Sequence, residues 1–308
     1  MSVNAEAMRS GAREAEERPV VSLIICTKNR GQQLRACLDR VARLKAPFRW
    51  ELILVDNGST DDTAQVMREF LSRFPGEGRY LHESRPGNGA GRNAAIRVSR
   101  GGILAFTDDD CYVEEDFLVE IAKVFSDPRV GYLTGRIMLF DPTDYRITVN
   151  ESPQPRRISA GRVVPHGLVQ GANMAFRRSA LEQAGLFDED FGAGARFAGE
   201  DWELALRVSF AGWDGGYFPG PTVWHHHGRK EPEARKLDRF YTIGEGAVYA
   251  KGVISHRRRL KMLGYWLKRL GGDLLKRRSM HRVRLVTWGA LQYVLLRIRH
   301  CQRTETAR

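Results

Sequence analysis

The sequence is poor in cysteine and contains no hydrophobic run long enough to cross a membrane. Its four cysteines stand far apart and form no CxxC pair, which argues against a disulfide framework and predicts reduced thiols in a cytoplasmic protein. The first 18 residues lack the apolar segment of a signal peptide, so we expect residues 1–18 to form a disordered leader. No GxxxxGKS or GxxxxGKT motif occurs, and no GxGxxG follows a predicted strand. P-loop and Rossmann dinucleotide sites are therefore not supported.

Charge is abundant but unevenly distributed. Hydrophobic residues make up 42% and charged residues 28% of the 308 positions, a balance typical of a globular chain that can bury a large core. The formal net charge is +12. Residues 256–308 hold 15 Lys and Arg against two acids, whereas the rest of the chain holds 34 bases and 35 acids. The positive charge therefore belongs to a C-terminal tail on a nearly neutral body.

From residue 19 onward, short apolar runs alternate with helical periodicity. This alternation predicts an α/β domain over residues 19–255, with a mostly parallel, Rossmann-like central sheet flanked by helices. Residues 141–165 are rich in Pro, Arg and Ser and are predicted to form a mobile loop suited to a lid. We predict strands at 20–26, 51–55, 80–81, 103–106, 130–140, 216–218 and 222–226, and helices near 34–44, 59–74, 88–99 and 200–211.

Three consecutive acids, Asp108, Asp109 and Asp110, directly follow the predicted strand 103–106. Open α/β sheets bind their ligands at the carboxyl ends of the strands, where these acids would lie. Clustered carboxylates repel one another unless a cation neutralises them, which favours a divalent metal. The alternative is a solvated acidic turn.

Two further clusters carry candidate functional groups. Glu200 and Asp201 begin a predicted helix after a glycine-rich stretch, where an acid can also serve only as a helix cap. His225 and His227 fall on one face of a short strand, because side chains alternate along a strand. Imidazole beside a carboxylate cluster can complete a metal site.

Seven blocks of the sequence resemble, in the same order, the family 2 glycosyltransferases with the GT-A fold. They are IICTKNR, VDNGSTDD, GNGAGRNAAI, FTDDDC, GANMAFRR, GEDWELALR and VWHHHG, within residues 19–230. The resemblance implies that a sugar moves, with inversion, from a nucleotide-diphosphate sugar to an acceptor hydroxyl. It is specific for family and fold and not for substrate. A UDP-linked donor is expected as the commonest in the family, and no residue separates it from dTDP- or GDP-linked donors.

The resemblance also implies roles on the donor side. Thr27, Arg30 and Asp56 would hold the base and ribose, and Arg92 and Asn93 would face the nucleotide and diphosphate. Base recognition falls on Asp56 alone, because the next position is Asn where many relatives have a second acid.

A metal site and a general base follow from the same resemblance. Asp108 and Asp110 match the DxD motif that binds Mn²⁺ or Mg²⁺, with Asp109 between them in the donor site. His225 would be the third ligand, with His227 as its alternate. Asp201 would be the general base.

The remaining expected contacts concern the sugars. Gly171 and Asn173 would line the donor or acceptor sugar, and Glu200 would lie beside the general base. Trp202 would stack on a sugar ring.

Two other functions were weighed against this one. A sugar-nucleotide pyrophosphorylase would have a glycine-rich, Arg-containing loop after the first strand, where this sequence has CTKNRGQQ. A non-catalytic protein that binds sugar nucleotides, or nucleic acid through the basic tail, would have no need of Asp108, Asp110, Asp201 and His225 together. The tail also contains no nucleic-acid recognition motif.

The tail at 256–308 is predicted to be a basic, amphipathic helical extension. Leu260, Leu263, Leu267, Leu270 and Leu274 form an apolar stripe at helical spacing. In one interpretation the stripe lies on the anionic inner face of the cytoplasmic membrane, with a glycan or lipid-linked acceptor in polysaccharide or cell-envelope assembly. In the other it packs on the catalytic domain as a cap. The apolar segment 286–296 is too short to span a bilayer.

Overall fold

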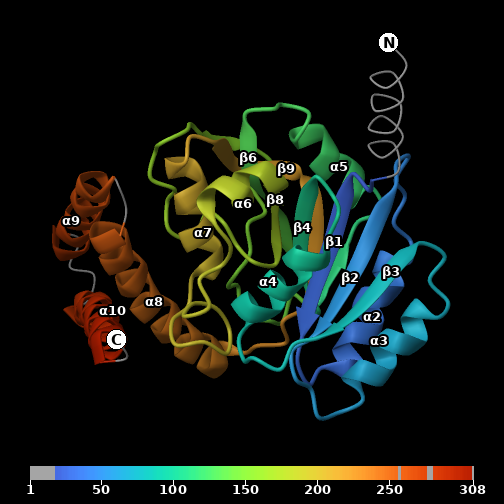
Figure 1. The fold of residues 1–308 in the computed structure, drawn as a ribbon, viewed down its shortest axis with the longest axis horizontal. Coiled ribbons are helices and arrows are strands. Elements are labelled where there is room, and N and C mark those ends of the chain that lie inside the picture. The colour runs from blue at the N-terminus through green and yellow to red at the C-terminus, as the bar shows by residue number, and fades with distance from the viewer. Residues whose placement is uncertain (1–17, 256–257, 276–279, 307–308) are drawn as a thin grey trace.

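The computed structural model describes residues 18–255, 258–275 and 280–306 (Figure 1). The predicted leader, apart from its last residue, lies outside the described residues. The strands are β1 (Val21–Thr27), β2 (Trp50–Asp56), β3 (Glu77–His82), β4 (Ile103–Asp108), β5 (Cys111–Val113), β6 (Val130–Leu139), β7 (Arg156–Ile158), β8 (Asn173–Arg177) and β9 (Asp214–His225). The helices are α2 (Gly31–Val41), α3 (Thr63–Leu71), α4 (Asn88–Val98), α5 (Phe117–Val124), α6 (Arg178–Ala184), α7 (Glu200–Phe210), α8 (Glu231–Ser255), α9 (Arg259–Leu275) and α10 (Met280–Thr306).

The strands form one nine-stranded sheet in the order β3-β2-β1-β4-β8-β6-β9-β5, with β7 paired to β9. The first four strands in this order are parallel, whereas β8 runs antiparallel to both β4 and β6. The predicted α/β architecture with a central sheet flanked by helices is confirmed. Its parallel part positions the site, because the register pairs Thr27 with Asp56 and Cys26 with Asp108 at one edge of the sheet.

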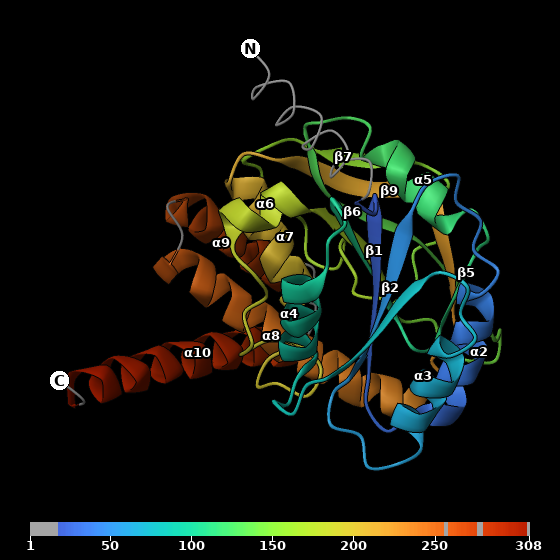
Figure 2. The same cartoon turned by 45° about the vertical axis from the view of Figure 1, so that its right-hand side comes forward.

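Both faces of the sheet are buried, which explains the continuous apolar runs of β1, β2 and β4. Along β1, Leu23 and Ile25 point into a core shared with α2, α3 and α5. Ile24 points the other way, into a core shared with α4, α6 and α7. The second core extends to α8, α9 and α10, which form an outer layer next to α7 (Figures 1 and 2).

Several elements differ from the prediction. The two strands expected at 216–218 and 222–226 are one twelve-residue strand, β9, whose pairing with β6 shifts register midway. The elements β5, α5, β7, β8, α6 and α8 were not predicted, and β7 pairs with β9 inside the segment 141–165 that was predicted to be a mobile loop. Helix α3 begins at Thr63 rather than near residue 59, and the Asp61 carboxylate accepts a hydrogen bond from the Thr63 amide (3.0 Å).

The tail helices pack on α8 through close backbone contacts. A Cβ added at Gly246 of α8 would collide with the carbonyl oxygen of Val286 in α10, and one at Gly289 of α10 would collide with that of Ile243 in α8. Small residues at a helix crossing let the two backbones approach closely. The tail and the catalytic body therefore share one core.

Three of the five leucines in the α9 stripe face away from that core. Leu260, Leu267 and Leu274 are 78%, 58% and 54% exposed, whereas Met262 on the opposite face is fully buried. Partly buried Tyr265, Trp266 and Leu270 pack against the core beside Met262. The interpretation that the leucine stripe as a whole packs on the domain is therefore wrong. No helix in the described part of the chain has both the length and the hydropathy needed to traverse a bilayer.

Candidate active site

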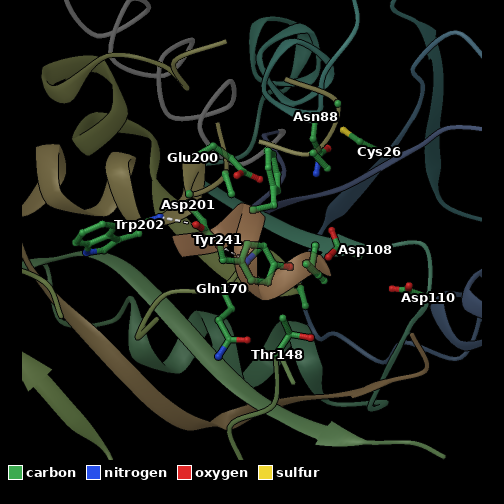
Figure 3. A pocket seen from close by; sticks show the side chains of 18 of the residues that line it. Cys26, Asn88, Asp108, Asp110, Thr148, Gln170, Glu200, Asp201, Trp202 and Tyr241 are labelled. Carbon is green, nitrogen blue, oxygen red and sulfur yellow. Dashed lines mark hydrogen bonds between the residues drawn. The ribbon is translucent and has the colours of Figure 1, made fainter. Parts of the chain in front are cut away.

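A cavity of about 750 Å³ opens at the carboxyl edge of β1, β2 and β4. Its walls are the ends of these strands, the loop 166–172, the start of α7 and one side of α8. Figure 3 shows Asp108 and Asp201 on opposite sides of this space, with Tyr241 of α8 between them. The sheet and α7 thus bring together acids that lie about 90 positions apart in the sequence.

The three consecutive acids point in different directions. Asp109 lies 2.9 Å from the Arg30 guanidinium and accepts a hydrogen bond from the Thr27 hydroxyl. Burial raises the pKa of Asp109 to about 7 although Arg30 opposes the shift. Arg30 also lies 2.7 Å from Asp110. The Arg30 guanidinium at the end of β1 is therefore joined to both Asp109 and Asp110.

Asp110 and His225 lie side by side, with Oδ1 and Nε2 3.3 Å apart. Burial would raise the pKa of Asp110, but the hydrogen bond and charge of His225 and the charge of Arg30 outweigh it and lower that pKa. A ligand atom of Cys111 lies within 4.8 Å of those of Asp110 and His225, and all three residues are buried. A buried carboxylate and imidazole, with a thiol nearby, are donors that suit a divalent transition metal. This donor set fits the predicted metal.

The other two predicted metal ligands, Asp108 and His227, do not join the cluster of Asp110, Cys111 and His225. Asp108 is at the end of β4 and turns toward Arg92, with Oδ1 3.3 Å from NH2. His227 lies two residues beyond the end of β9, so the two histidines do not share a strand as predicted, but their rings are neighbours, edge-on at 5.1 Å between centroids. The Nδ1 atom of His227 accepts the Arg229 amide at 3.0 Å.

Arg92 lies in the interior, between two acids from different elements. Its guanidinium donates to Glu200 at 2.7 Å and to Asp108 at 3.3 Å, and its side chain is 3% exposed. If Arg92 contacts the donor as predicted, it does so while it bridges Asp108 at the end of β4 and Glu200 in α7. Gly171 is close to the same group, because a Cβ there would come within 2.8 Å of Arg92.

Asp201 is held at the first turn of α7 by two backbone amides. Its Oδ2 accepts from Gly171 at 2.8 Å and its Oδ1 from Trp202 at 2.7 Å. Burial, together with the neighbouring charge of Glu200, raises the pKa of Asp201 to about 7. A carboxylate with a pKa near neutrality on a cavity wall has the properties of a general base.

Four predicted contact residues are engaged elsewhere. The Asp56 carboxylate is buried and accepts from the Ser59 amide (2.8 Å) and the Tyr80 hydroxyl (3.2 Å), so it orders the turn after β2. Asn93 binds the backbone N–H and C=O of Phe187. Both residues lie outside the lining of the cavity.

The other two pack into the fold. Asn173 is fully buried and donates to the carbonyls of Arg136 and Pro221, which ties β8 to neighbouring strands. Trp202 is 2% exposed and donates its indole N–H to Val164 at 2.8 Å. Its ring also lines the cavity from this buried position and packs edge-on against His166, at 4.9 Å between ring centroids.

Sequence reasoning missed several lining residues, among them Asn57, Thr148, Gln170, Arg229 and Tyr241. Thr148 had a signal, since it lies in the loop predicted as a lid. It adopts φ 50°, which is unusual for a β-branched residue, and its hydroxyl lies 3.3 Å from Nδ1 of His225. No sequence signal pointed to Tyr241, because nothing in the sequence marked α8 as a wall of the cavity.

Replacing Arg92 with methionine should strongly destabilise the protein. Glu200 and Asp108 would lose their shared cation, and breaking a buried ion pair typically costs about 3–5 kcal/mol of the free energy of unfolding. Arg85→Met is the control, because Arg85 is half exposed where it pairs with Glu83 and Glu189, and exposed ion pairs contribute little to stability. Urea unfolding of both variants measures the difference. Equal losses would contradict the structural role of Arg92.

Solved structures with a similar architecture include a mannosyltransferase. The mannosyltransferase PcManGT from Pyrobaculum calidifontis, in complex with GDP-Man and Mn²⁺, aligns with a TM-score of 0.61 and 23% identity over 90% of this chain and 81% of its own. TarS 1–349 from S. aureus, in complex with UDP-GlcNAc, aligns with a TM-score of 0.60 and 14% identity over 79% of this chain and 69% of its own. The fold is therefore the GT-A glycosyltransferase fold.

The sequence comparisons identify the family. The profile described as "Glycosyl transferase family 2" matches residues 22–185, which is more than half of the chain. The glycosyltransferase AglE of Haloferax volcanii is 24% identical over 75% of this chain and 73% of its own length. The chain spans 49% and 25% of the length of two other curated relatives. The protein belongs to glycosyl transferase family 2 and is a glycosyltransferase.

Proposed function

We propose that the protein transfers a sugar from a nucleotide-diphosphate sugar, UDP-linked, to an acceptor hydroxyl in a single inverting displacement. The observation that carries the proposal is Asp201, a carboxylate of raised pKa on the wall of a cavity whose opposite wall holds Asp108. The acceptor would belong to polysaccharide or cell-envelope glycan assembly.

Asp201 would act as the general base. In this step the acceptor oxygen attacks the anomeric carbon, the bond from that carbon to the diphosphate breaks, and the hydroxyl proton passes to Asp201. The two backbone hydrogen bonds from Gly171 and Trp202 fix the carboxylate before the acceptor arrives. Such preorganisation keeps the base at the reacting hydroxyl without a reordering cost.

The donor would lie along the ends of β1, β2 and β4. This part of the cavity is lined by Thr27, Arg30, Asp108 and Asp109, and Asn57 borders it. Asp56, which was predicted to recognise the base, is buried beneath it. We therefore place base and ribose recognition on the chain around Thr27, Arg30 and Asn57, with Asp56 shaping the turn that carries Asn57.

A divalent cation fits the remaining acids. Asp110 and His225, together with Asp108, would hold Mn²⁺ or Mg²⁺, which when bound supplies positive charge to the diphosphate that leaves. The structurally similar PcManGT is described in complex with Mn²⁺. Arg30 would share in the same role, since it already lies within 3 Å of Asp109 and Asp110.

A donor screen by thermal shift tests this function. UDP-sugars with Mn²⁺ should raise Tm by about 4 °C at roughly 100 times their Kd. GDP- and dTDP-sugars form the comparison arms, because the two similar solved structures hold GDP-Man and UDP-GlcNAc. A larger shift in Tm with GDP- or dTDP-sugars would replace uridine as the assigned nucleoside of the donor. The absence of a shift with any sugar nucleotide would contradict the proposed function.

A further inference from the structure

Helix α10 has an apolar face that the described structure leaves uncovered. Trp288, Leu291, Leu295 and Ile298 recur at spacings of three and four residues and are 51%, 47%, 44% and 49% exposed. The opposite face of the same helix is buried against α8 and the core. A helix on a protein surface normally turns a polar face to solvent, whereas the uncovered face of α10 is apolar.

Helix α9 presents a second such face. The half- to fully exposed Leu260, Leu267 and Leu274 are seven residues apart, so they project from the same side of the helix. A Cβ at Gly264 or Gly271, which lie between them, would meet no other atom within 4 Å. The three leucines therefore project from the helix beside open space at these two glycines. We name the exposed residues of α9 and α10 together the outer apolar faces.

Positive charge surrounds the outer apolar faces. The exposed bases on these two helices are Arg259, Lys261, Lys268, Arg284, Arg297 and Arg299. Asp273 is buried and lies 3.4 Å from Arg282, so it offers no exposed negative charge. An apolar face rimmed by Lys and Arg complements an anionic lipid surface. A second copy of this chain would instead bring the same positive charge against it.

We propose that α9 and α10 bind an anionic lipid bilayer through the outer apolar faces. The leucine stripe identified in the sequence supplies one part of this surface, and α10 supplies the part that only the structure shows. Both helices lie in the outer layer, on the far side of α8 from α7 (Figures 1 and 2).

The same layer reaches the cavity. Tyr241 and Phe240 of α8 line the cavity, and Glu245, one turn further along, is fully buried. The Glu245 carboxylate accepts hydrogen bonds from Arg269 of α9 (3.3 Å) and from Arg282 of α10. It also lies 3.9 Å from His166 in the loop 166–172.

The wall of the cavity that α8 forms and the outer apolar faces are thus parts of one packed unit. If the proposed transferase function holds, a bilayer bound to this unit lies next to the acceptor side of the cavity. The acceptor would then be lipid-linked and would be delivered from the membrane surface. Lipid binding itself does not depend on the transferase function.

Vesicle flotation of the full chain tests the proposal. The protein should float with vesicles that contain phosphatidylglycerol and stay in solution with pure phosphatidylcholine, because the bases around the faces require anionic headgroups. Leu291→Gln/Leu295→Gln keeps the charge and should lower partitioning roughly 10-fold or more. Ala36→Gln, an exposed and uncharged substitution in α2 on the other side of the molecule, should leave it unchanged.

Trp288 supplies a direct readout. Its emission should shift to the blue with anionic vesicles, and Trp288→Phe should abolish that part of the shift while the protein still floats. Donor binding by thermal shift shows that each variant is folded, and it separates a failure of lipid binding from a failure of the transferase function. Equal flotation of wild type and Leu291→Gln/Leu295→Gln would overturn the proposal. So would a dimer that forms through these faces without binding vesicles.

Discussion

Asp201→Asn is expected to lower kcat by roughly 10²–10⁴-fold, the usual contribution of a general base. The amide has the shape of the carboxylate and can still accept a hydrogen bond from Gly171, but it cannot take the proton of the acceptor hydroxyl. Donor binding should be retained, because the donor would lie along β1, β2 and β4 on the other side of the cavity. Initial rates and a donor thermal shift measure the two effects separately.

The pH dependence of the rate gives an independent check on the same residue. Burial and Glu200 raise the pKa of Asp201 to about 7, and the base acts only when deprotonated. The rate should therefore rise as pH increases through about 7 and then level off. Asp109 titrates in the same range, so the step must be compared with Asp201→Asn, in which it should disappear. Asp116→Asn, an exposed acid at the start of α5, is the control. A wild-type rate in Asp201→Asn would remove Asp201 from the mechanism.

Asp110→Ala is expected to abolish metal-dependent donor binding. Asp110 would provide a metal ligand, and even residues that only orient metal ligands account for about 10–100-fold of metal affinity. The loss should therefore exceed about 100-fold. The measurement is a donor thermal shift with Mn²⁺ and with a chelator, which should differ in wild type and coincide in the variant.

The control for this experiment is an acid on another surface. Asp116→Ala should keep the Mn²⁺ dependence, because Asp116 is exposed at the start of α5 and lies outside the lining of the cavity. An unchanged Mn²⁺ dependence in Asp110→Ala would place the metal elsewhere. Loss of the dependence in both variants would point to a general structural effect.

The edge of the sheet that carries the site was predictable because parallel strands obey simple rules. Apolar runs identified β1, β2 and β4, and the carboxyl ends of such strands meet at one edge. Thr27, Asp56 and Asp108 are neighbours there, as the register shows. What sequence order could not give is the direction of each side chain. Asp56 turns into the fold, Asp108 toward Arg92 and Asp110 toward His225.

Amide side chains were the least predictable members of the site. Asn93 and Asn173 lie in blocks that resemble donor-binding motifs, yet both are used to satisfy backbone carbonyls in the interior. A buried backbone carbonyl must be paired, and an Asn can do so as readily as it can bind a ligand. Sequence alone does not distinguish these two uses. Helix α8 was missed for a related reason, since it is packed on several sides by other helices and lacks a single apolar stripe.

The buried carboxylate of Glu245 has a consequence for how the tail can be studied. Two of the tail's bases, Arg269 and Arg282, are its counter-ions, so not all of the positive charge in the last 53 residues is available to a partner outside the protein. Deleting the tail would remove both cations from an interior acid and uncover Phe191 and Phe197, which pack on Tyr293 of the tail. A truncated chain would therefore fail as an enzyme for reasons unrelated to membranes. Point substitutions on the surface are therefore needed to test where the enzyme is located without disturbing its fold.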